Sequence, residues 1–389
     1  MSQTSPSLSQ IDHLMQDAVG RVFPAATLLI ARADEILLHR AYGPQGAADD
    51  HPPVTPATRF DLASVSKLFT ATALMLLVQD GRVRVDAPIH QTLPEFGATR
   101  RIAPIQDPIT REILPPLAGE VGEEVDVSGV TFRHLLTHTS GLAPWRGLFL
   151  DIPQARPIPL PHRISPELRA RRVELILQRR DLAYPPGQRI AYSDLGLILL
   201  GEAVSRIAGQ PLDVFIERRI LQPLGLHHTG FNPLAQEVPR HEIAPTEVCA
   251  WRQRRCWGEV HDENAASLAG VAGHAGLFAT AQDLLAFARA FLPAADGLLR
   301  PRLVEEMTRE QARWQGLRRG LGWQLPGEEG APVGRAWPRE GFGHTGFTGT
   351  SLWIDPARQL IVILLTNRVY FGRSNTTIID FRPQLHNLI

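Results

Sequence analysis

Residues 61–81 read DLASVSKLFTATALMLLVQDG, and this stretch contains the strongest helix signal and the most unusual residue of the chain. From Ser64 to Gln79 the run is strongly apolar and has neither glycine nor proline before Gly81. Such a run, closed by a glycine, predicts a buried helix that stops at Gly81. Lys67, in the first turn, is the single lysine among the 40 basic residues of the chain.

A lysine in a chain that otherwise uses arginine suggests that proton transfer is needed at that position. Arginine keeps its proton at physiological pH, whereas a desolvated lysine can release it. Ser64 and Lys67 are three residues apart, so both side chains project from one helix face, and Ser64 lies at the helix start, where negative charge is favoured. A nearby amine whose charge is suppressed by burial can activate a serine hydroxyl. The alternative is an ordinary helix start with a solvent-facing Lys67.

Composition excludes several classes of protein. The chain has 389 residues, 40 basic and 40 acidic residues, and 44% hydrophobic residues. A net charge of zero argues against a partner that selects basic surfaces, such as nucleic acid or a membrane surface, and the hydrophobic content argues against disorder. The length predicts two or three compact lobes. Cys249 and Cys256 are too few for a disulfide framework or a zinc site, so we interpret them as buried thiols.

No targeting or membrane segment is evident in the sequence. The first 17 residues have neither a basic segment nor an apolar core, so we expect no secretory signal. The longest aliphatic run, Leu360 to Leu365, is far shorter than the roughly 18 apolar residues that a membrane span requires. We therefore expect a soluble, cytoplasmic protein without a membrane span; its oligomeric state is not predicted.

Hydrophobic periodicity places strands at both ends of the chain and helices between them. We expect a first helix over 11–22, a hairpin of strands 26–30 and 36–42, and final strands over 351–354 and 359–366. Residues 88–131, rich in proline and glycine, are expected to be irregular. Further helices are expected at about 131–138, 166–180, 194–208, 211–222 and 276–291.

This order predicts an α+β fold. The first and last strands can form one antiparallel sheet only if the chain returns, which makes the helical middle an inserted lobe. We therefore expect a single catalytic unit over 1–389, with an α+β lobe from 11–62 plus 275–389 and a mainly helical lobe from 63–274. A cleft between the lobes is the expected location of a site.

Two further segments carry candidate site residues. Tyr192-Ser-Asp194 opens a predicted helix, where a tyrosine hydroxyl can relay a proton; the alternative is a half-buried tyrosine with a satisfied hydroxyl. Residues 341–349 read GFGHTGFTG, and four glycines in nine residues predict a strand edge that another molecule approaches closely. The alternative for this second segment is a glycine-rich turn.

Three motifs of this sequence resemble those of the penicillin-recognising serine hydrolases. Ser64-Val-Ser-Lys67, Tyr192-Ser-Asp194 and His344-Thr-Gly346 occur in the order and approximate spacing of that family. Its branch with class C β-lactamases, D-alanyl-D-alanine carboxypeptidases, D-aminopeptidases and β-lactamase-like esterases is the most similar. The resemblance covers roughly residues 11–385 and implies a β-lactamase/transpeptidase-like fold, with an antiparallel sheet flanked by helices.

The resemblance also implies roles for individual residues. Ser64 would be the acylated nucleophile, Lys67 its activating partner and Tyr192 the acid/base, while the backbone N–H groups of Ser64 and Phe347 would form the oxyanion hole. The substrate-binding residues would be Asp194, His344, Thr345 and Gly346. The reaction would hydrolyse an ester, peptide or β-lactam through an acyl-enzyme, without metal or cofactor. The alternative is a penicillin-binding or sensor protein of the same fold with little or no turnover.

Two departures from the family pattern favour a peptidase or esterase over a β-lactamase. Asp194 stands where the family often has asparagine, and an ionised carboxylate only accepts hydrogen bonds. His344 stands where β-lactamases mostly carry lysine. A histidine is mostly neutral near pH 7, so we expect it to attract an anionic substrate more weakly.

Other catalytic patterns are not supported. The sequence contains no G-x-S-x-G motif, which argues against an α/β-hydrolase nucleophile elbow. His134 and His138 have the spacing of some zinc ligands, but the glutamate of H-E-x-x-H is missing, so we interpret them as structural. The arginines over 163–189 and 251–257 are mixed with acids or tryptophans, and we interpret the first stretch as a solvated helix face rather than a nucleic-acid groove.

Overall fold

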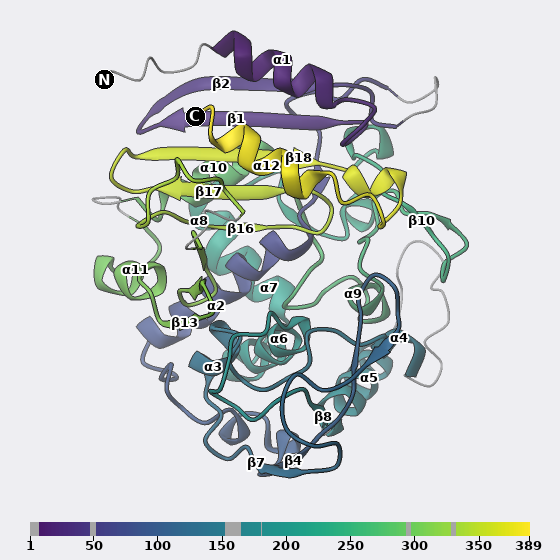
Figure 1. Ribbon diagram of the computed structural model, residues 1–389, viewed down its shortest axis with the longest axis vertical. Helices are drawn as coiled ribbons and strands as arrows, with labels where there is room; N and C mark the ends of the chain where they lie inside the picture. The colour runs from purple at the N-terminus through teal and green to yellow at the C-terminus, as the bar shows by residue number, and fades with distance from the viewer. Residues whose placement is uncertain (1–7, 47–51, 152–164, 180, 293–296, 328–331) are drawn as a thin grey trace.

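An eight-stranded antiparallel sheet fills one half of the molecule, and both ends of the chain contribute to it (Figure 1). This computed structural model describes residues 8–46, 52–151, 165–179, 181–292, 297–327 and 332–389. In sheet order the strands are β13 (Ala312–Trp314), β14 (Leu317–Arg319), β15 (Gln324–Leu325), β16 (Phe342–Thr345), β17 (Ser351–Asp355), β18 (Leu360–Thr366), β1 (Ala26–Arg32) and β2 (Glu35–Tyr42).

The first and last strands of the chain lie side by side near one edge of the sheet, with only β2 beyond them. β1 pairs with β18 over their full lengths, from Ala26 opposite Thr366 to Arg32 opposite Leu360. β1 also pairs with β2 in the predicted hairpin, which turns at Ala33 and Asp34. The expected return of the chain to its first strands is therefore confirmed, and with it the α+β fold class.

Alternate side chains of β1 and β18 pack into two separate hydrophobic cores, because successive side chains of a strand face opposite sides of the sheet. Leu28 and Val362 pack with helices α1 (Leu8–Ala18) and α12 (Ile378–His386) on one face. Leu29 and Ile363 face the larger core on the other side, where α10 (Ala281–Arg289) lies behind the sheet in Figure 1. Both faces of β1 and β18 are thus covered.

The other half of the molecule is mainly helical and surrounds the predicted buried helix. That helix, α2 (Ser66–Gln79), is apolar on all sides and packs against α6 and α7. Helices of this half are α3 (Phe132–Leu136), α4 (Leu148–Asp151), α5 (Pro166–Gln178), α6 (Asp194–Ala208), α7 (Leu212–Ile216), α8 (Gln222–Leu224) and α9 (Glu263–Ser267), and α11 (Pro301–Thr308) lies beside β13.

A small three-stranded sheet positions the start of α2. Strand β3 (Phe60–Asp61) pairs with β12 (Leu277–Ala279), which also pairs with β9 (Gly230–Phe231). The chain passes from β3 into a 3₁₀ turn, Ala63–Val65, and then directly into α2. The segment with Ser64 therefore lies where the two halves of the molecule meet.

Three expectations about secondary structure were wrong in part. The expected helix over 276–291 begins as β12 and becomes helical only after Thr280, whose side chain accepts the Asp283 N–H and caps α10. The helix expected over 211–222 is broken into α7, a π-helical turn and α8. Residues 88–131 are not wholly irregular, because they form β4 (Thr99–Ile102), β5 (Ile105–Gln106), β6 (Ile113–Leu114) and β7 (Glu124–Asp126), with β8 (Asp181–Leu182) beside β4.

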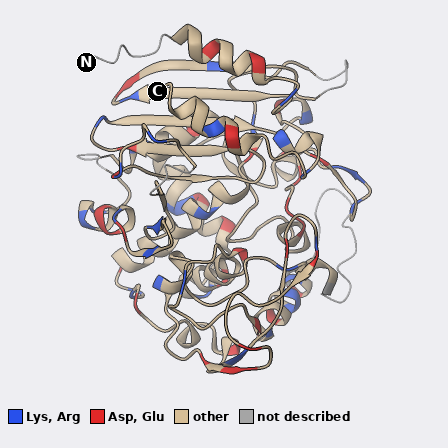
Figure 2. Ribbon diagram, in the orientation of Figure 1, with Lys and Arg blue, Asp and Glu red and all other residues tan. Residues whose placement is uncertain are grey.

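Charged residues of both signs are interspersed over helices and loops, whereas the central strands carry few charges (Figure 2). Among the described residues, no helix combines the length and apolarity needed to cross a membrane.

Strands β10 (Val248–Cys249) and β11 (Arg254–Arg255) form a separate hairpin. The two thiols, at 249 and 256, are free and buried, as expected.

We predict that Ile363→Ala destabilises the protein by about 2–5 kcal/mol, because it opens a cavity in the middle of a fully buried strand. Urea unfolding monitored by circular dichroism measures this loss. Ile379→Ala is the matched control, since Ile379 is 60% exposed and its loss should cost no more than about 0.5 kcal/mol. Equal losses in the two variants would contradict the core assignment.

Candidate active site

Ser64 and Lys67 lie together where the two halves of the molecule meet. Lys67 Nζ donates hydrogen bonds to Ser64 Oγ at 2.8 Å and to the carbonyl oxygen of His274 at 3.0 Å. The lysine is only 1% exposed. It therefore does not point into solvent, and its amine is in hydrogen-bond contact with the serine hydroxyl.

Asp194, the first residue of α6, completes a short chain of polar contacts. Its Oδ1 lies 2.8 Å from Lys67 Nζ, so the amine bridges a hydroxyl and a carboxylate. Ser193 fixes the helix start, because its Oγ accepts the Gly196 N–H and donates to the carbonyl of Ala143 at 2.7 Å. The carboxylate at 194 is thus held by a capped helix terminus.

The pKa of Lys67 differs from the sequence-based expectation. Burial lowers the pKa of this amine, but the Asp194 carboxylate and the neighbouring Tyr192 outweigh burial, and the pKa is raised above its ordinary value. We expected burial to suppress the lysine charge, and this is corrected: Lys67 is an ammonium ion at neutral pH. The reason is the ion pair with Asp194, a contact between residues 127 positions apart that sequence reasoning did not foresee.

Tyr192 presents its ring to the same cluster. Lys67 Nζ lies 5.0 Å from the ring centroid, and the rings of His138 and His344 lie 4.6 and 5.9 Å from it. Burial raises the pKa of Tyr192, and the lowering influence of Lys67 and Ser64 does not offset it. The phenol is therefore protonated at neutral pH.

The glycine-rich segment forms strand β16 and the turn that follows it. The Gly346 N–H donates to the carbonyl of Thr350 at 2.7 Å, and His344 is 1% exposed. Burial lowers the pKa of His344 well below its ordinary value, and Lys67 and Arg319 lower it further, so the imidazole is neutral. β16 lies inside the sheet, but β15 pairs with it only at Gly343, so His344 and Thr345 pair with β17 alone, and His344 lies beside Tyr192.

The backbone at Phe347 is available for a ligand. Its N–H donates no hydrogen bond to any of the described residues, whereas its carbonyl accepts from Arg368 Nε at 2.8 Å. The ring of Phe347 stacks on His261 at 5.6 Å between centroids. The side chain and the carbonyl are therefore fixed, while the N–H has no acceptor among the described residues.

Several residues that hold the Ser64 segment were missed by sequence reasoning. The buried Asp61 carboxylate accepts the N–H groups of Ala63 at 2.8 Å and His261 at 2.6 Å. Ala63, directly before Ser64, has a φ of +46°, a strained conformation for a residue with a side chain. The sequence places Asp61 three residues before Ser64, but its role depends on a contact with His261, 200 residues away, which the sequence does not show.

Threonines from the opposite half of the molecule complete this support. Thr350 Oγ1 donates to the Leu62 carbonyl at 2.9 Å, and Thr348 Oγ1 donates to the Asp61 carbonyl at 2.7 Å. These contacts span nearly 290 residues and join the turn after β16 to the strand before Ser64. They fix the position of the turn after β16 relative to the Ser64 segment.

The histidine pair 134 and 138 has structural roles, as expected. His134 takes part in the N-terminal cap of α3, and His138 Nδ1 accepts the Ser193 N–H at 3.0 Å. Among the residues that the structure describes, no three or more metal-binding side chains lie close enough to share an ion. Sequence reasoning did not predict that the His138 ring lies against the candidate site residue Tyr192.

Comparisons with known proteins agree on the family. A model of the family described as Beta-lactamase matches residues 11–384. A protein of Escherichia coli (strain K12), provisionally named D-alanyl-D-alanine carboxypeptidase, is 30% identical over 93% of this chain and 82% of its own. EstCE1, described as a hydrolase with promiscuous acyltransferase activity, has a similar structure with a TM-score of 0.69, at 23% identity over 97% of this chain and 98% of its own. A β-lactamase/D-alanine carboxypeptidase from Yersinia pestis gives a TM-score of 0.66, at 20% identity and 98% coverage of both chains.

These matches define the class of the protein. The fold is that of the β-lactamases and penicillin-binding proteins, so the resemblance inferred from three short motifs is confirmed over nearly the whole chain. The chain belongs to the β-lactamase family, whose members and structural neighbours are hydrolases.

We predict that Gly346→Ala disrupts the site. A Cβ at this position would lie 2.1 Å from Thr350 Oγ1 and 2.6 Å from the Leu62 carbonyl oxygen, so the strand edge must move away from the Ser64 segment. We expect at least a tenfold loss of reactivity of Ser64 toward a fluorophosphonate probe, measured as a labelling rate. Gly129→Ala, which has open space around its Cβ and no positive φ, should label at the parental rate. Unchanged labelling of Gly346→Ala would show that the close approach is not needed.

Proposed function

We propose that this chain is a serine hydrolase that cleaves an amide or ester through an acyl-enzyme, with Ser64 as the nucleophile. One observation carries the proposal: a fully buried lysine amine lies 2.8 Å from the Ser64 hydroxyl and 2.8 Å from the Asp194 carboxylate. Such a chain can move a proton away from the hydroxyl as it attacks a carbonyl carbon. The carboxypeptidase name of the relative from Escherichia coli supports an acyl substrate.

The proton route follows from the charge of Lys67. Because the amine is an ammonium ion, it first releases a proton to Asp194 and then accepts the Ser64 proton. The Oγ–H bond breaks, the bond from Oγ to the carbonyl carbon forms, and the net proton transfer is from Ser64 to Asp194. Lys67 ends as a cation beside the tetrahedral intermediate, whose negative charge it stabilises. Asparagine at 194 could not accept this proton.

Tyr192 would serve the leaving group. Its protonated phenol donates a proton to the departing nitrogen or oxygen, and the carbon–heteroatom bond breaks. The phenolate then recovers a proton from Lys67, which takes one back from Asp194, and the starting charges are restored. A water molecule cleaves the Ser64 ester by the same steps in reverse order, which releases the acid and the free serine.

The remaining residues would bind the carbonyl and its substituents. The backbone N–H groups of Ser64 and Phe347 would hold the oxyanion, and the free N–H at Phe347 supports this role. His344, Thr345 and Gly346, on the edge of β16, would line the site beside the substrate. A neutral His344 binds through hydrogen bonds rather than charge.

We predict that Ser64→Ala abolishes covalent labelling by a fluorophosphonate or penicillin-type probe and all turnover of p-nitrophenyl esters. Lys67→Arg should also lose at least 1,000-fold in kcat, because arginine keeps the positive charge but cannot relay a proton. Intact-protein mass spectrometry and ester hydrolysis measure the two effects. Ser374→Ala, on the surface, is the matched control.

Two results would contradict this assignment. An adduct that survives in Ser64→Ala places the nucleophile elsewhere, and a Lys67→Arg chain with most of its kcat removes the need for a proton relay. Stable labelling of Ser64 without turnover of esters, nitrocefin or D-alanyl peptides would instead favour a penicillin-binding or sensor protein.

We predict that Asp194→Asn lowers kcat/KM about 100-fold at pH 7, because the terminal proton acceptor is lost. Without the carboxylate, only Tyr192 still opposes the effect of burial on Lys67, so the pKa of the amine falls and its neutral form becomes accessible at lower pH. The deficit relative to the parent chain should therefore shrink as pH rises from 7 to 10. Asp17→Asn, on the exposed side of α1, should match the parent chain at every pH. A deficit that is independent of pH would contradict the relay.

A further inference from the structure

A buried arginine binds the turn that carries the Phe347 N–H. Arg382, on α12, is 6% exposed, and its Nη2 donates to the carbonyl oxygens of Gly346 and Thr350, each at 2.9 Å. Both carbonyls also accept a backbone hydrogen bond, because the Gly349 N–H donates to Gly346 and the Gly346 N–H donates to Thr350. The turn therefore does not need the guanidinium to satisfy these two carbonyls.

A second buried arginine holds the next peptide group of the turn. The Nε of Arg368 donates to the Phe347 carbonyl at 2.8 Å, and its guanidinium carbon lies 4.6 Å from the centroid of the Phe347 ring. Arg368 begins the 3₁₀ turn that follows β18, whereas Arg382 lies on α12. Two separate elements thus bring a cation to consecutive peptide groups of one turn.

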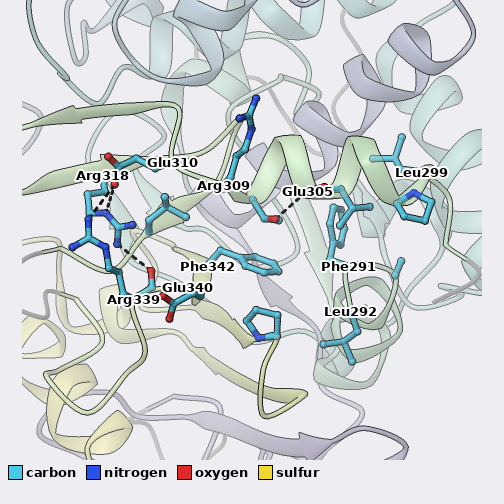
Figure 3. A pocket seen from close by; sticks show the side chains of 16 residues that line it. Phe291, Leu292, Leu299, Glu305, Arg309, Glu310, Arg318, Arg339, Glu340 and Phe342 are labelled. Atoms are coloured by element: carbon cyan, nitrogen blue, oxygen red, sulfur yellow. Dashed lines mark hydrogen bonds and ion pairs between the residues drawn. The ribbon is translucent and has the colours of Figure 1, made fainter. Parts of the chain in front are cut away.

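The hydrogen bonds of both guanidinium groups go to backbone carbonyls in the part of the chain that the structure describes. Arg318, of similar burial, has a different kind of partner, because its Nε lies 2.5 Å from a carboxylate oxygen of Glu310. Figure 3 shows this ion pair at one end of a hollow of about 590 Å³ beside α11. Arg368 and Arg382 have no such carboxylate contact among the described residues.

Both arginines behind the turn are cations at neutral pH. Burial and the charge of Arg368 lower the pKa of Arg382 to about 9, and burial lowers the pKa of Arg368 to about 10. A buried charge without a carboxylate contact is unfavourable, and two like charges repel each other. Their position therefore indicates a role beyond stability.

The geometry of the peptide group links Arg382 to the Phe347 N–H. The Gly346 carbonyl and the Phe347 N–H belong to one planar trans peptide, in which the two bonds point in opposite directions. Gly346 itself lies against the Ser64 segment, because a Cβ there would meet the Leu62 carbonyl oxygen at 2.6 Å and Ala63 Cβ at 3.4 Å. A cation that holds the carbonyl oxygen fixes the direction of the N–H, and it makes the N–H a stronger donor, since hydrogen bonds that share a group polarise one another.

We propose that Arg382 is a positioning residue of the oxyanion hole, which orients and polarises the Gly346–Phe347 peptide through its carbonyl oxygen, while Arg368 fixes the following peptide. The Phe347 N–H then binds a negatively charged oxygen more strongly than an ordinary backbone N–H does, because it is already oriented before the charge develops. The effect on rate rests on the proposed hydrolase function, whereas the polarised peptide can be measured without turnover.

The first measurement observes the peptide group directly by NMR. The chain contains three Gly–Phe peptide bonds, at 230–231, 341–342 and 346–347. Glycine labelled with ¹³C at its carbonyl and phenylalanine labelled with ¹⁵N therefore give three correlations, and the one that Phe347→Leu removes is assigned to 346–347. Arg382→Met should move the nitrogen resonance of 346–347 to lower frequency, because a hydrogen bond to the carbonyl deshields the amide nitrogen. The other two correlations should stay in place, and Arg382→Lys should reverse most of the shift.

The second measurement tests the effect on the reaction. Arg382→Met should lower kcat for p-nitrophenyl esters about tenfold at unchanged KM, a part of the roughly 100- to 1,000-fold lost when a whole oxyanion donor is removed. The affinity for an aryl trifluoromethyl ketone, which adds to a serine as an anion, should fall by the same factor as kcat/KM. The melting temperature should stay at or above the parental value, because a buried charge is removed and both carbonyls keep a backbone donor. Arg382→Lys, which keeps a cation, should recover most of kcat.

Arg100→Met is the matched control. Arg100 is 2% exposed and donates to the carbonyls of Phe96 and Leu177, each at 3.2 Å. Its strand, β4, lies at the far end of the helical half of the molecule (Figure 1). This variant should keep the parental kcat and leave all three correlations in place.

The outcomes separate this inference from the hydrolase proposal. An unmoved 346–347 resonance in Arg382→Met would overturn the inference, and so would a shifted resonance with an unchanged kcat. A loss of kcat that Arg382→Lys shares would also overturn it, because packing rather than charge would then be the cause. If Ser64 never becomes acylated but the resonance shifts in Arg382→Met and returns in Arg382→Lys, the hydrolase proposal fails and the polarised peptide stands.

Discussion

The contact of one buried ammonium ion with a hydroxyl and a carboxylate is the interaction on which the site depends. Lys67 can be buried because Asp194 supplies the opposite charge at 2.8 Å and the His274 carbonyl accepts a further hydrogen bond. Without those partners, burial would remove the charge of the amine or leave the lysine unable to occupy this position. The same carboxylate raises the pKa of the lysine, so the amine is protonated at neutral pH.

Hydrogen bonds to the strained backbone segment before Ser64 hold this residue in place. The positive φ of Ala63 is maintained by the buried Asp61 carboxylate, which binds two backbone N–H groups, and by Thr348 and Thr350 from the far end of the chain. Strands β1 and β18 are buried on both faces, and β18 pairs with β17, the strand that follows the turn after β16. This turn therefore links the sheet to the Ser64 segment.

His344 is neutral, and the nearest buried cation outside the Lys67–Asp194 pair that acts on it is not in the glycine-rich motif itself. It is Arg319 on β14, two strands away in the sheet, whose guanidinium carbon lies 5.4 Å from the centroid of the Tyr192 ring. Arg318 donates hydrogen bonds within the fold, whereas Nη1 of Arg319 has no hydrogen-bond partner among the described residues. Two adjacent arginines of similar burial thus differ in how far the fold satisfies them.

Local patterns in the sequence were sufficient to predict the hairpin of β1 and β2, the buried helix after Ser64, and the return of the final strands. They also brought Ser64 and Lys67 together, because a spacing of three residues aligns side chains in a 3₁₀ turn as well as in an α-helix, although Ser64 lies in the turn before α2 and not in the helix itself. The strands β13 to β15 are too short to give a periodic signal, so the position of Arg319 could not be predicted. The charge state of Lys67 and the unpaired guanidinium were likewise decided by tertiary structure, since burial and ion pairing depend on residues more than 100 positions apart.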